Sequence, residues 1–248
     1  MRNLKLEIEY DGTHYCGWQV QGRRNGKKKS IQEVLEKTLR NILNERIQTI
    51  VSGRTDAGVH ALAQVVNFKT TRPIPLFRLK YALNCLLPGD ISVSKIKEVP
   101  LDFHSRFKAK SKTYRYTILN RAHPSALLRN MVYFCPYALN LSLMRKESRF
   151  LLGKHDFKAF QTADKKERSS VRVVKKISIA KKRDFVYIII QADGFLYNMV
   201  RNIAGTLIEI GKGRLAFGSL KKIMDSRNRR YAGPTAPAKG LSLVKVDY

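Results

Sequence analysis

A short segment with two glycines, an arginine and an aspartate carries residue types that could do chemistry. Gly53-Arg54-Thr55-Asp56-Ala57-Gly58-Val59-His60 lies between two predicted strands. Glycine permits tight turns that other residues resist. Asp56 lies near the middle, and the nearby Arg54 favours its ionised carboxylate, which can act as a nucleophile or a base. The structural alternative is an Asx-turn, because the segment has no second carboxylate for acid–base pairing.

A second group of residues could contact a polyanion. Arg106, Lys108, Lys110 and Lys112 occupy every second position, so an extended chain would present four cations on one side. Such a row either follows a phosphate backbone or is a solvated strand face. Tyr114, which can stack on a base, follows directly.

Arg201 lies inside an otherwise apolar run of helical spacing. A partly buried arginine there needs a carboxylate or phosphate partner, unless its side chain extends to solvent. Further basic clusters are typical of solvated loops, and they lie at 22–29, 165–168 and 227–230.

The net charge narrows the class of partner. The chain has 248 residues, with 48 Lys and Arg against 19 Asp and Glu, a net charge of +29. That is far beyond the magnitude of about 2 to 8 that suits a small domain. Nucleic acid is favoured, because its phosphates release counterions when Lys and Arg neutralise them. A membrane is disfavoured, because the sequence has neither a basic amphipathic helix nor a run of about 18 apolar residues.

Composition and motifs exclude several other classes. Hydrophobic residues make up 44% of the chain, which indicates a globular protein rather than a disordered one. Cys16, Cys85 and Cys135 are widely spaced, which favours a reducing cytoplasm and indicates neither a disulfide framework nor a zinc site. The motifs of P-loop, dinucleotide-binding, zinc-protease and serine-hydrolase enzymes are missing. A cofactor-free reaction on nucleic acid remains.

Hydrophobic periodicity predicts the elements that position these side chains. In the first half we expect strands at 4–10, 47–51, 65–68 and 91–96, and helices at 31–43 and 76–86. The first of these helices begins with a capping box of Ser30 and Glu33. In the second half we expect strands at 114–118, 171–179, 185–191 and 241–246, and helices at 142–152, 195–210 and 220–224.

The order of these elements indicates the α+β class. We expect two α+β domains, residues 1–105 with the Asp56 loop and residues 106–248. Each would be a mainly antiparallel sheet with helices packed on one face.

The segment from Gly53 to Ala61 resembles the catalytic loop of the TruA family of tRNA pseudouridine synthases. Further blocks resemble that family in the same order, and the resemblance extends from residue 4 to about 247. These blocks lie at 9–12, 17–19, 87–91, 103–107, 112–116, 195–205 and 240–244.

The resemblance implies a cytoplasmic homodimer that needs no cofactor and no catalytic metal. It would convert uridines at positions 38 to 40, in the anticodon arm of tRNA, into pseudouridine. A basic cleft between the two domains would hold the aspartate at its floor. Asp56 would be the essential carboxylate, Arg54 would displace or hold the flipped uridine, Tyr114 would pack on the base, and Arg201 would pair with Asp56.

These residue types suit the reaction that the resemblance implies. The N1–C1′ bond breaks, the uracil turns and C5 joins C1′, so a carboxylate must act on ribose or base and the C5 proton must be removed. Asp56 can add to C1′, abstract the C2′ proton or add to C6. A uridine in a stem must first be extruded, which a cation and an aromatic platform favour.

Two other functions stay open at this stage. A non-catalytic RNA-binding module explains the charge but gives Asp56 no role. A metal-dependent nuclease would need several carboxylates around magnesium, and the acidic residues form no evident cluster in the sequence. Replacing Asp56 by Ala should abolish isomerisation but spare tRNA binding, should leave a mere binder unchanged, and should be one of several harmful acidic changes in a nuclease.

Overall fold

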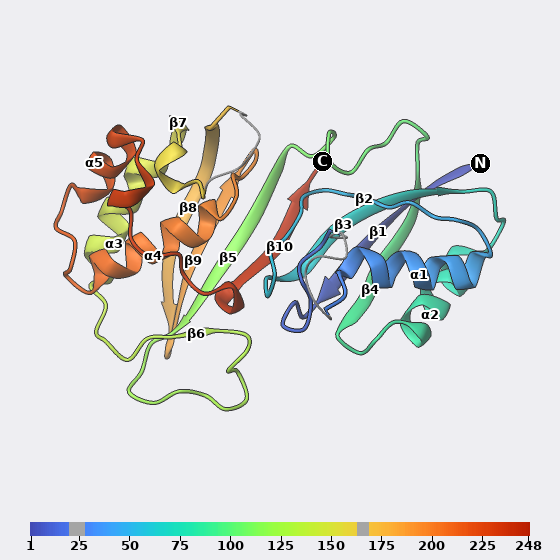
Figure 1. Ribbon diagram of the computed structural model, residues 1–248, viewed down its shortest axis with the longest axis horizontal. Helices are drawn as coiled ribbons and strands as arrows, with labels where there is room; N and C mark the ends of the chain where they lie inside the picture. The colour runs from blue at the N-terminus through green and yellow to red at the C-terminus, as the bar shows by residue number, and fades with distance from the viewer. Residues whose placement is uncertain (20–27, 163–168) are drawn as a thin grey trace. The chain divides into compact units, whose positions relative to one another are not determined.

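The computed structural model describes residues 1–19, 28–162 and 169–248. The basic segment 22–29 lies outside the described residues except for Lys28 and Lys29, and of the cluster 165–168 nothing is described. The chain divides into two compact units (Figure 1). Unit 1 comprises residues 1–110 and 242–248, and unit 2 comprises residues 111–241. The predicted domains 1–105 and 106–248 stay a prediction, and residues 242–248, expected in the second half, pack in unit 1.

Unit 1 is built on a mainly antiparallel sheet. Its central strands are β1 (Arg2–Tyr10) and β3 (His60–Thr70), which pair antiparallel with each other. β4 (Ile91–Val99) pairs antiparallel with β1, and β2 (Ile50–Val51) pairs antiparallel with β3. On the other side β10 (Leu241–Asp247) joins β3 in parallel. The core forms where alternate residues of β1, including Leu4, Leu6 and Ile8, are completely buried.

Two helices of unit 1 pack against each other, and the second of them contacts β4 (Figure 1). α1 spans Ile31–Leu43 and α2 spans Leu76–Leu86. α1 begins where the Ser30 side chain accepts a hydrogen bond of 3.1 Å from the backbone N of Glu33, which confirms Ser30 as the N-cap of the predicted capping box. It ends at Asn44, whose left-handed φ of 46° stops the helix.

In unit 2, β9 (Phe185–Ala192) lies between β5 (Ser111–Leu119) and β8 (Val171–Lys182). β7 (Gly153–Asp156) pairs with the other edge of β8, and β5, β9, β8 and β7 are each antiparallel to their neighbours. β6 (Tyr133–Phe134) joins β5 in parallel. The helices are α3 (Leu141–Ser148), α4 (Met199–Gly211) and α5 (Ser219–Ser226). Short 3₁₀ helices lie at Arg149–Leu151, Lys158–Phe160, Arg229–Tyr231 and Ala238–Gly240.

The α+β class with mainly antiparallel strand pairing is confirmed, and the strands of the described residues belong to one ten-stranded sheet instead of separate sheets. Across the described parts of the chain, no helix combines the length and apolar character needed to cross a bilayer. Several local predictions need correction. The strand expected at 47–51 is reduced to β2 at Ile50–Val51, and the helix expected at 142–152 is α3 at Leu141–Ser148 followed by a 3₁₀ helix at Arg149–Leu151. β3 begins at His60 instead of residue 65, α4 begins at Met199 because Asn198 has a φ of 59°, and the short strands β6 and β7 were not expected.

The predicted row of four cations is wrong. Residues 105–107 form a turn, across which the backbone N of Lys108 donates to the carbonyl of His104 at 3.0 Å. A turn does not alternate side chains between two sides, so Arg106 and Lys108 do not lie in an extended row with Lys112, which is on β5.

Candidate active site

The loop that carries Asp56 spans residues 52–59, between β2 and β3 of unit 1. Its first residue is fixed to the sheet, because the backbone N of Ser52 donates to the carbonyl of Val65 at 2.8 Å. Within the loop, the backbone N of Val59 donates to the carbonyl of Asp56 at 3.1 Å. Gly58 closes this turn with a φ of 75°, a conformation that favours glycine.

Two glycines from outside the loop pack directly against its backbone. A Cβ atom built on Gly12 would lie 2.1 Å from the carbonyl oxygen of Val59, and one built on Gly17 would lie 2.7 Å from that of Thr55. Gly17 also has a φ of 102°. The next residue, Trp18, donates its backbone N–H to the same Thr55 carbonyl at 3.0 Å. The close approach of the two segments therefore requires glycine at both positions.

A buried hydrogen-bond network with residues of β1 and β3 holds the loop in place. The hydroxyl of Tyr10 lies 2.8 Å from Oγ1 of Thr55, the residue before Asp56. Gln64, which is completely buried, donates to the carbonyl of Gly53 at 2.9 Å and to the Tyr10 hydroxyl at 3.3 Å, and accepts from Ser52 Oγ at 2.7 Å. Burial raises the pKa of Tyr10 to about 12, although its hydrogen bonds oppose this, so the hydroxyl stays protonated.

At the end of the loop, the buried His60 begins β3. Its Nδ1 lies 3.0 Å from Oδ1 of Asp11 and 3.1 Å from the backbone N of Gly12. One nitrogen cannot donate to the carboxylate and accept from the amide at once. Burial opposes ionisation of Asp11, but hydrogen bonds from Thr13 and the nearby His60 outweigh it and lower the pKa of Asp11. The two contacts of Nδ1 connect the start of β3 to residues 11 and 12, which precede the loop in the chain.

This arrangement fixes the backbone around Asp56 while leaving its side chain partly accessible. Asp56 is half-buried and Arg54 is exposed. A carboxylate on a rigid loop of this kind can be presented to a substrate with little loss of conformational entropy. The geometry therefore suits a nucleophile or base at Asp56 and an exposed cation at Arg54.

In unit 2, Tyr114 lies on β5 with 7% of its surface exposed. Its ring meets that of Phe195 edge to face, with centroids 5.1 Å apart and planes at 85°. Such a pair restricts the rotation of both rings. Tyr114 is therefore held by its neighbours in a defined orientation.

Arg201 lies in the first turns of α4 and is fixed by the segment that follows α5. Its Nε donates to the carbonyl of Ala236 at 2.7 Å, and Nη1 donates to Oδ1 of Asn198 at 2.9 Å. Gly205 lets this segment approach α4, because a Cβ there would lie 1.8 Å from the carbonyl oxygen of Pro234. These contacts determine the direction of the guanidinium group.

The structure places the predicted residues in two groups. Arg54 and Asp56 share the loop of unit 1, whereas Tyr114 and Arg201 belong to β5 and α4 of unit 2. Their roles, the pairing of Arg201 with Asp56 and the basic cleft between domains stay predictions. Sequence reasoning missed the positioning groups of Tyr10, Gly12, Gly17 and Gln64. Tyr10, Gly12 and Gly17 lie in the blocks 9–12 and 17–19 that resemble the family, but their residue types indicated no positioning role, and Gln64 had no signal.

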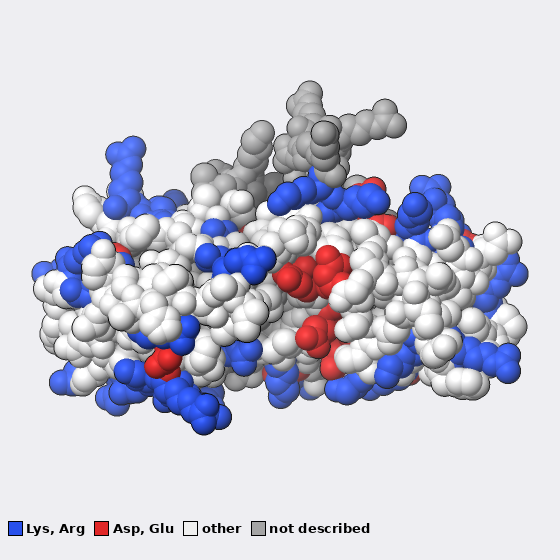
Figure 2. Space-filling view, turned by 90° about the horizontal axis from the view of Figure 1, so that it is seen from below, with Lys and Arg blue, Asp and Glu red and all other residues white. Residues whose placement is uncertain are grey.

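The surface carries the charge expected from the composition. Figure 2 shows Lys and Arg side chains spread over the visible face, with Asp and Glu side chains gathered in a few places. Among residues 1–19, 28–162 and 169–248, no three His, Cys, Asp or Glu side chains form a group that could hold a metal ion.

Comparison with known proteins adds to this geometry. The profile of a family described as tRNA pseudouridine synthase matches residues 7–108 and 148–248. The tRNA pseudouridine synthase A of Acetivibrio thermocellus is 46% identical over 248 residues, and that of Clostridium acetobutylicum is also 46% identical over 248 residues. Both alignments cover 100% of each chain.

The chain also has a distant likeness to a solved structure of an H/ACA RNP bound to a substrate RNA containing 2′-deoxyuridine. That alignment covers 97% of this chain and 47% of the other, at 13% identity and a TM-score of 0.37. The full-length relatives and the matching profile carry the assignment without it. The chain belongs to the family of tRNA pseudouridine synthases.

Proposed function

We propose that the protein isomerises uridine to pseudouridine at positions 38, 39 and 40 of tRNA, with Asp56 as the essential carboxylate and without a cofactor. The observation that carries this proposal is the half-buried Asp56 on a loop whose backbone is fixed by Gly12, Gly17 and Thr55. Family membership supports the reaction, and the net charge of +29 supports a polyanionic substrate.

The proposed reaction conserves atoms between substrate and product. The bond from N1 to C1′ breaks, a bond from C5 to C1′ forms, the C5 proton leaves and N1 gains a proton. Addition of the Asp56 carboxylate to C1′, its addition to C6, and abstraction of the C2′ proton all require the carboxylate beside the target nucleotide. Replacing Asp56 by Asn removes the reactive group in each case while keeping its shape.

Arg54, Tyr114 and Arg201 have supporting roles in this proposal. The exposed Arg54 holds or displaces the extruded uridine, and Tyr114 packs on its base. Arg201 pairs with Asp56, so that the carboxylate stays ionised and points in one direction. The fixed orientations of Tyr114 and Arg201 within unit 2 support these roles.

The test uses an unmodified tRNA transcript with uridines at 38 to 40, incubated with the purified protein without added nucleotide or cofactor. Chemical mapping should find pseudouridine in the anticodon arm with the wild type and none with Asp56→Asn, while the affinity for tRNA stays similar. Asp225→Asn is the matched control, because Asp225 is exposed on α5. Tight binding without pseudouridine from the wild type would favour the non-catalytic RNA-binding module instead.

The assembly and location complete the proposal. The family resemblance supports a homodimer, and a tRNA substrate fits a cytoplasmic location. Light scattering coupled to size-exclusion chromatography should give twice the mass of one chain. The mass of a single chain would contradict the homodimer without affecting the proposed reaction.

A further inference from the structure

A segment at residues 103–108 of unit 1, which contains a turn, is anchored by several buried polar contacts. Asn67 and Ser105 are both completely buried. Oδ1 of Asn67 accepts from the backbone N of Ser105 at 2.9 Å and from its Oγ at 2.7 Å. Asn3, also buried, donates to the carbonyl of Phe103 at 2.9 Å, and the Tyr248 hydroxyl donates to the carbonyl of Ser105 at 2.9 Å.

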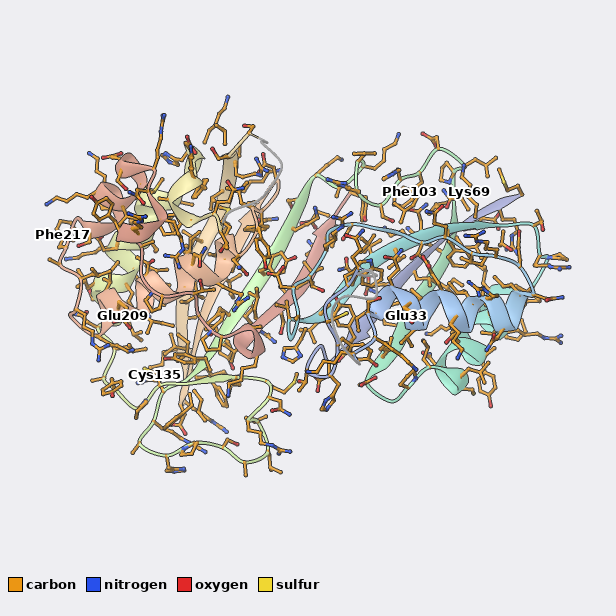
Figure 3. All side chains as sticks on the ribbon, in the orientation of Figure 1. Glu33, Lys69, Phe103, Cys135, Glu209 and Phe217 are labelled. Carbon is orange, nitrogen blue, oxygen red and sulfur yellow. The ribbon has the colours of Figure 1, made fainter. Side chains whose placement is uncertain are left out.

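The aromatic base of this turn is anchored as well. The rings of Phe103, labelled in Figure 3, and Tyr248 have centroids 5.1 Å apart. Nζ of Lys5 lies 5.2 Å from the Phe103 centroid and 3.9 Å from that of Tyr248. The turn is therefore held by packed rings and by hydrogen bonds in a low-dielectric environment, which makes it rigid.

On its outer side this rigid turn displays a large apolar ring. Phe107 is 76% exposed, and its ring stacks on that of His104 with centroids 4.2 Å apart and planes at 29°. The orientation of His104 is fixed, because its Nδ1 accepts from the backbone N of Arg106 and of Phe107 at 3.2 and 3.3 Å. The guanidinium carbon of Arg106 lies 5.7 Å from the Phe107 centroid.

We propose that Phe107, backed by His104 and flanked by Arg106, is a stacking platform for an unpaired nucleobase of the RNA substrate. Exposing a phenyl ring on a rigid support costs solvation in the free protein, which a stacked base recovers. The guanidinium of the neighbouring Arg106 can donate hydrogen bonds to the phosphate of the same nucleotide. The chain's charge of +29 favours RNA over a protein partner. This inference rests on the proposed function only for the nature of the substrate.

A second exposed phenylalanine provides a closely matched control. Phe77 lies on α2 and is 71% exposed, and the guanidinium carbon of its neighbour Arg78 is 5.8 Å from its ring centroid. Phe77 and Phe107 thus agree in exposure and in the adjacent arginine. Only Phe107 stacks on a second ring and lies on the anchored turn.

The experiment measures the affinity for a short anticodon-arm hairpin by fluorescence anisotropy, with Asp56→Asn in every protein so that no turnover occurs. Phe107→Ala should weaken binding by about 5-fold to 100-fold, as expected for the loss of one stacked base. Phe107→Leu should behave like Phe107→Ala, Phe107→Tyr should bind like the parent, and Phe77→Ala should change the affinity by less than 2-fold. The loss should disappear with a fully paired duplex of the same stem, because its bases are not available for stacking.

Three results of the binding assay would overturn this inference: equal binding by Phe107→Ala and the parent, an equal loss with Phe77→Ala, or an equal loss with the duplex. A different oligomeric state of Phe107→Ala in the absence of RNA, measured as the number of chains per particle, would assign the ring to a protein contact and would also refute the inference. Pseudouridine formation by the wild type is measured separately. A failure of the proposed reaction can thus be distinguished from a failure of the stacking platform.

Discussion

Replacing Gly12 by Ala should slow the reaction strongly without removing RNA binding. The new Cβ would lie 2.1 Å from the carbonyl oxygen of Val59, whereas real Cβ atoms essentially never approach closer than 3.0 Å. The two segments must therefore separate by about 0.9 Å. Because the backbone N of Val59 is hydrogen-bonded to the carbonyl of Asp56, this movement reaches the proposed nucleophile. A misplacement of about 1 Å typically costs about 100-fold in rate, or ~2.7 kcal/mol in activation free energy.

The assay is the single-turnover release of tritium from a tRNA transcript that carries 5-tritiated uridine, since joining C5 to C1′ frees the hydrogen on C5. Gly89→Ala is the matched control, because nothing lies within 4 Å of a Cβ at that glycine. The affinity for tRNA and the melting temperature show whether Gly12→Ala is folded. A folded Gly12→Ala protein with the wild-type rate would refute the argument that this glycine positions the Asp56 loop.

Three further predictions concern stability and RNA binding. The buried Glu147 accepts hydrogen bonds from two backbone amides at the start of α5, at 2.7 and 2.9 Å. Glu147→Ala should therefore lower the free energy of unfolding by ~3 kcal/mol. A loss below ~1 kcal/mol in urea titrations would contradict this expectation. Burial opposes ionisation of Glu209, but hydrogen bonds and charge from Lys212 and Arg214 outweigh it and lower the pKa of this carboxyl from its usual 4.5. The ionised Glu209 therefore stabilises the fold above about pH 4.5. This stabilisation is lost as the pH falls through the lower pKa of the folded state. Glu209→Gln should therefore flatten the acid side of the stability profile, and an unchanged profile would argue against it. The logarithm of the tRNA affinity should fall steeply and linearly with the logarithm of salt concentration, and a flat dependence would contradict phosphate contacts as the main source of affinity.

Local patterns predicted most elements because local interactions determine them. The cap of α1 needs only Ser30 and the backbone N of Glu33, which are three residues apart. The alternation in β1 reflects one buried face, so its position follows from the sequence alone. The boundary of α4 was wrong because the left-handed Asn198 has no signal in the apolar pattern, which begins at Phe195.

The turn at 103–108 shows where local reasoning fails. Its alternating cations suggested an extended chain, but Asn67 and Asn3 bind its backbone from strands about 40 and 100 residues away. Similarly, Asp56 stood out by its residue type and its place between two predicted strands, and the family resemblance supplied its expected role, whereas the loop contacts of Gly12 and Gln64 depend on how β1 and β3 pair. Long-range backbone approach leaves no periodic trace in one sequence.

The pairing of β10 with β3 has a consequence for biosynthesis. Residues 242–248 complete unit 1, although the other residues of that unit are the first 110 of the chain. A nascent chain that has reached residue 241 therefore has β3 without its parallel neighbour and the carbonyl of Ser105 without the Tyr248 hydroxyl. The loop with Asp56 and the turn with Phe107 both adjoin these late contacts. Unit 1 therefore reaches its final strand pairing only after residues 242–248 have been synthesised, and until then the β10 side of β3 exposes backbone groups that another strand could pair with.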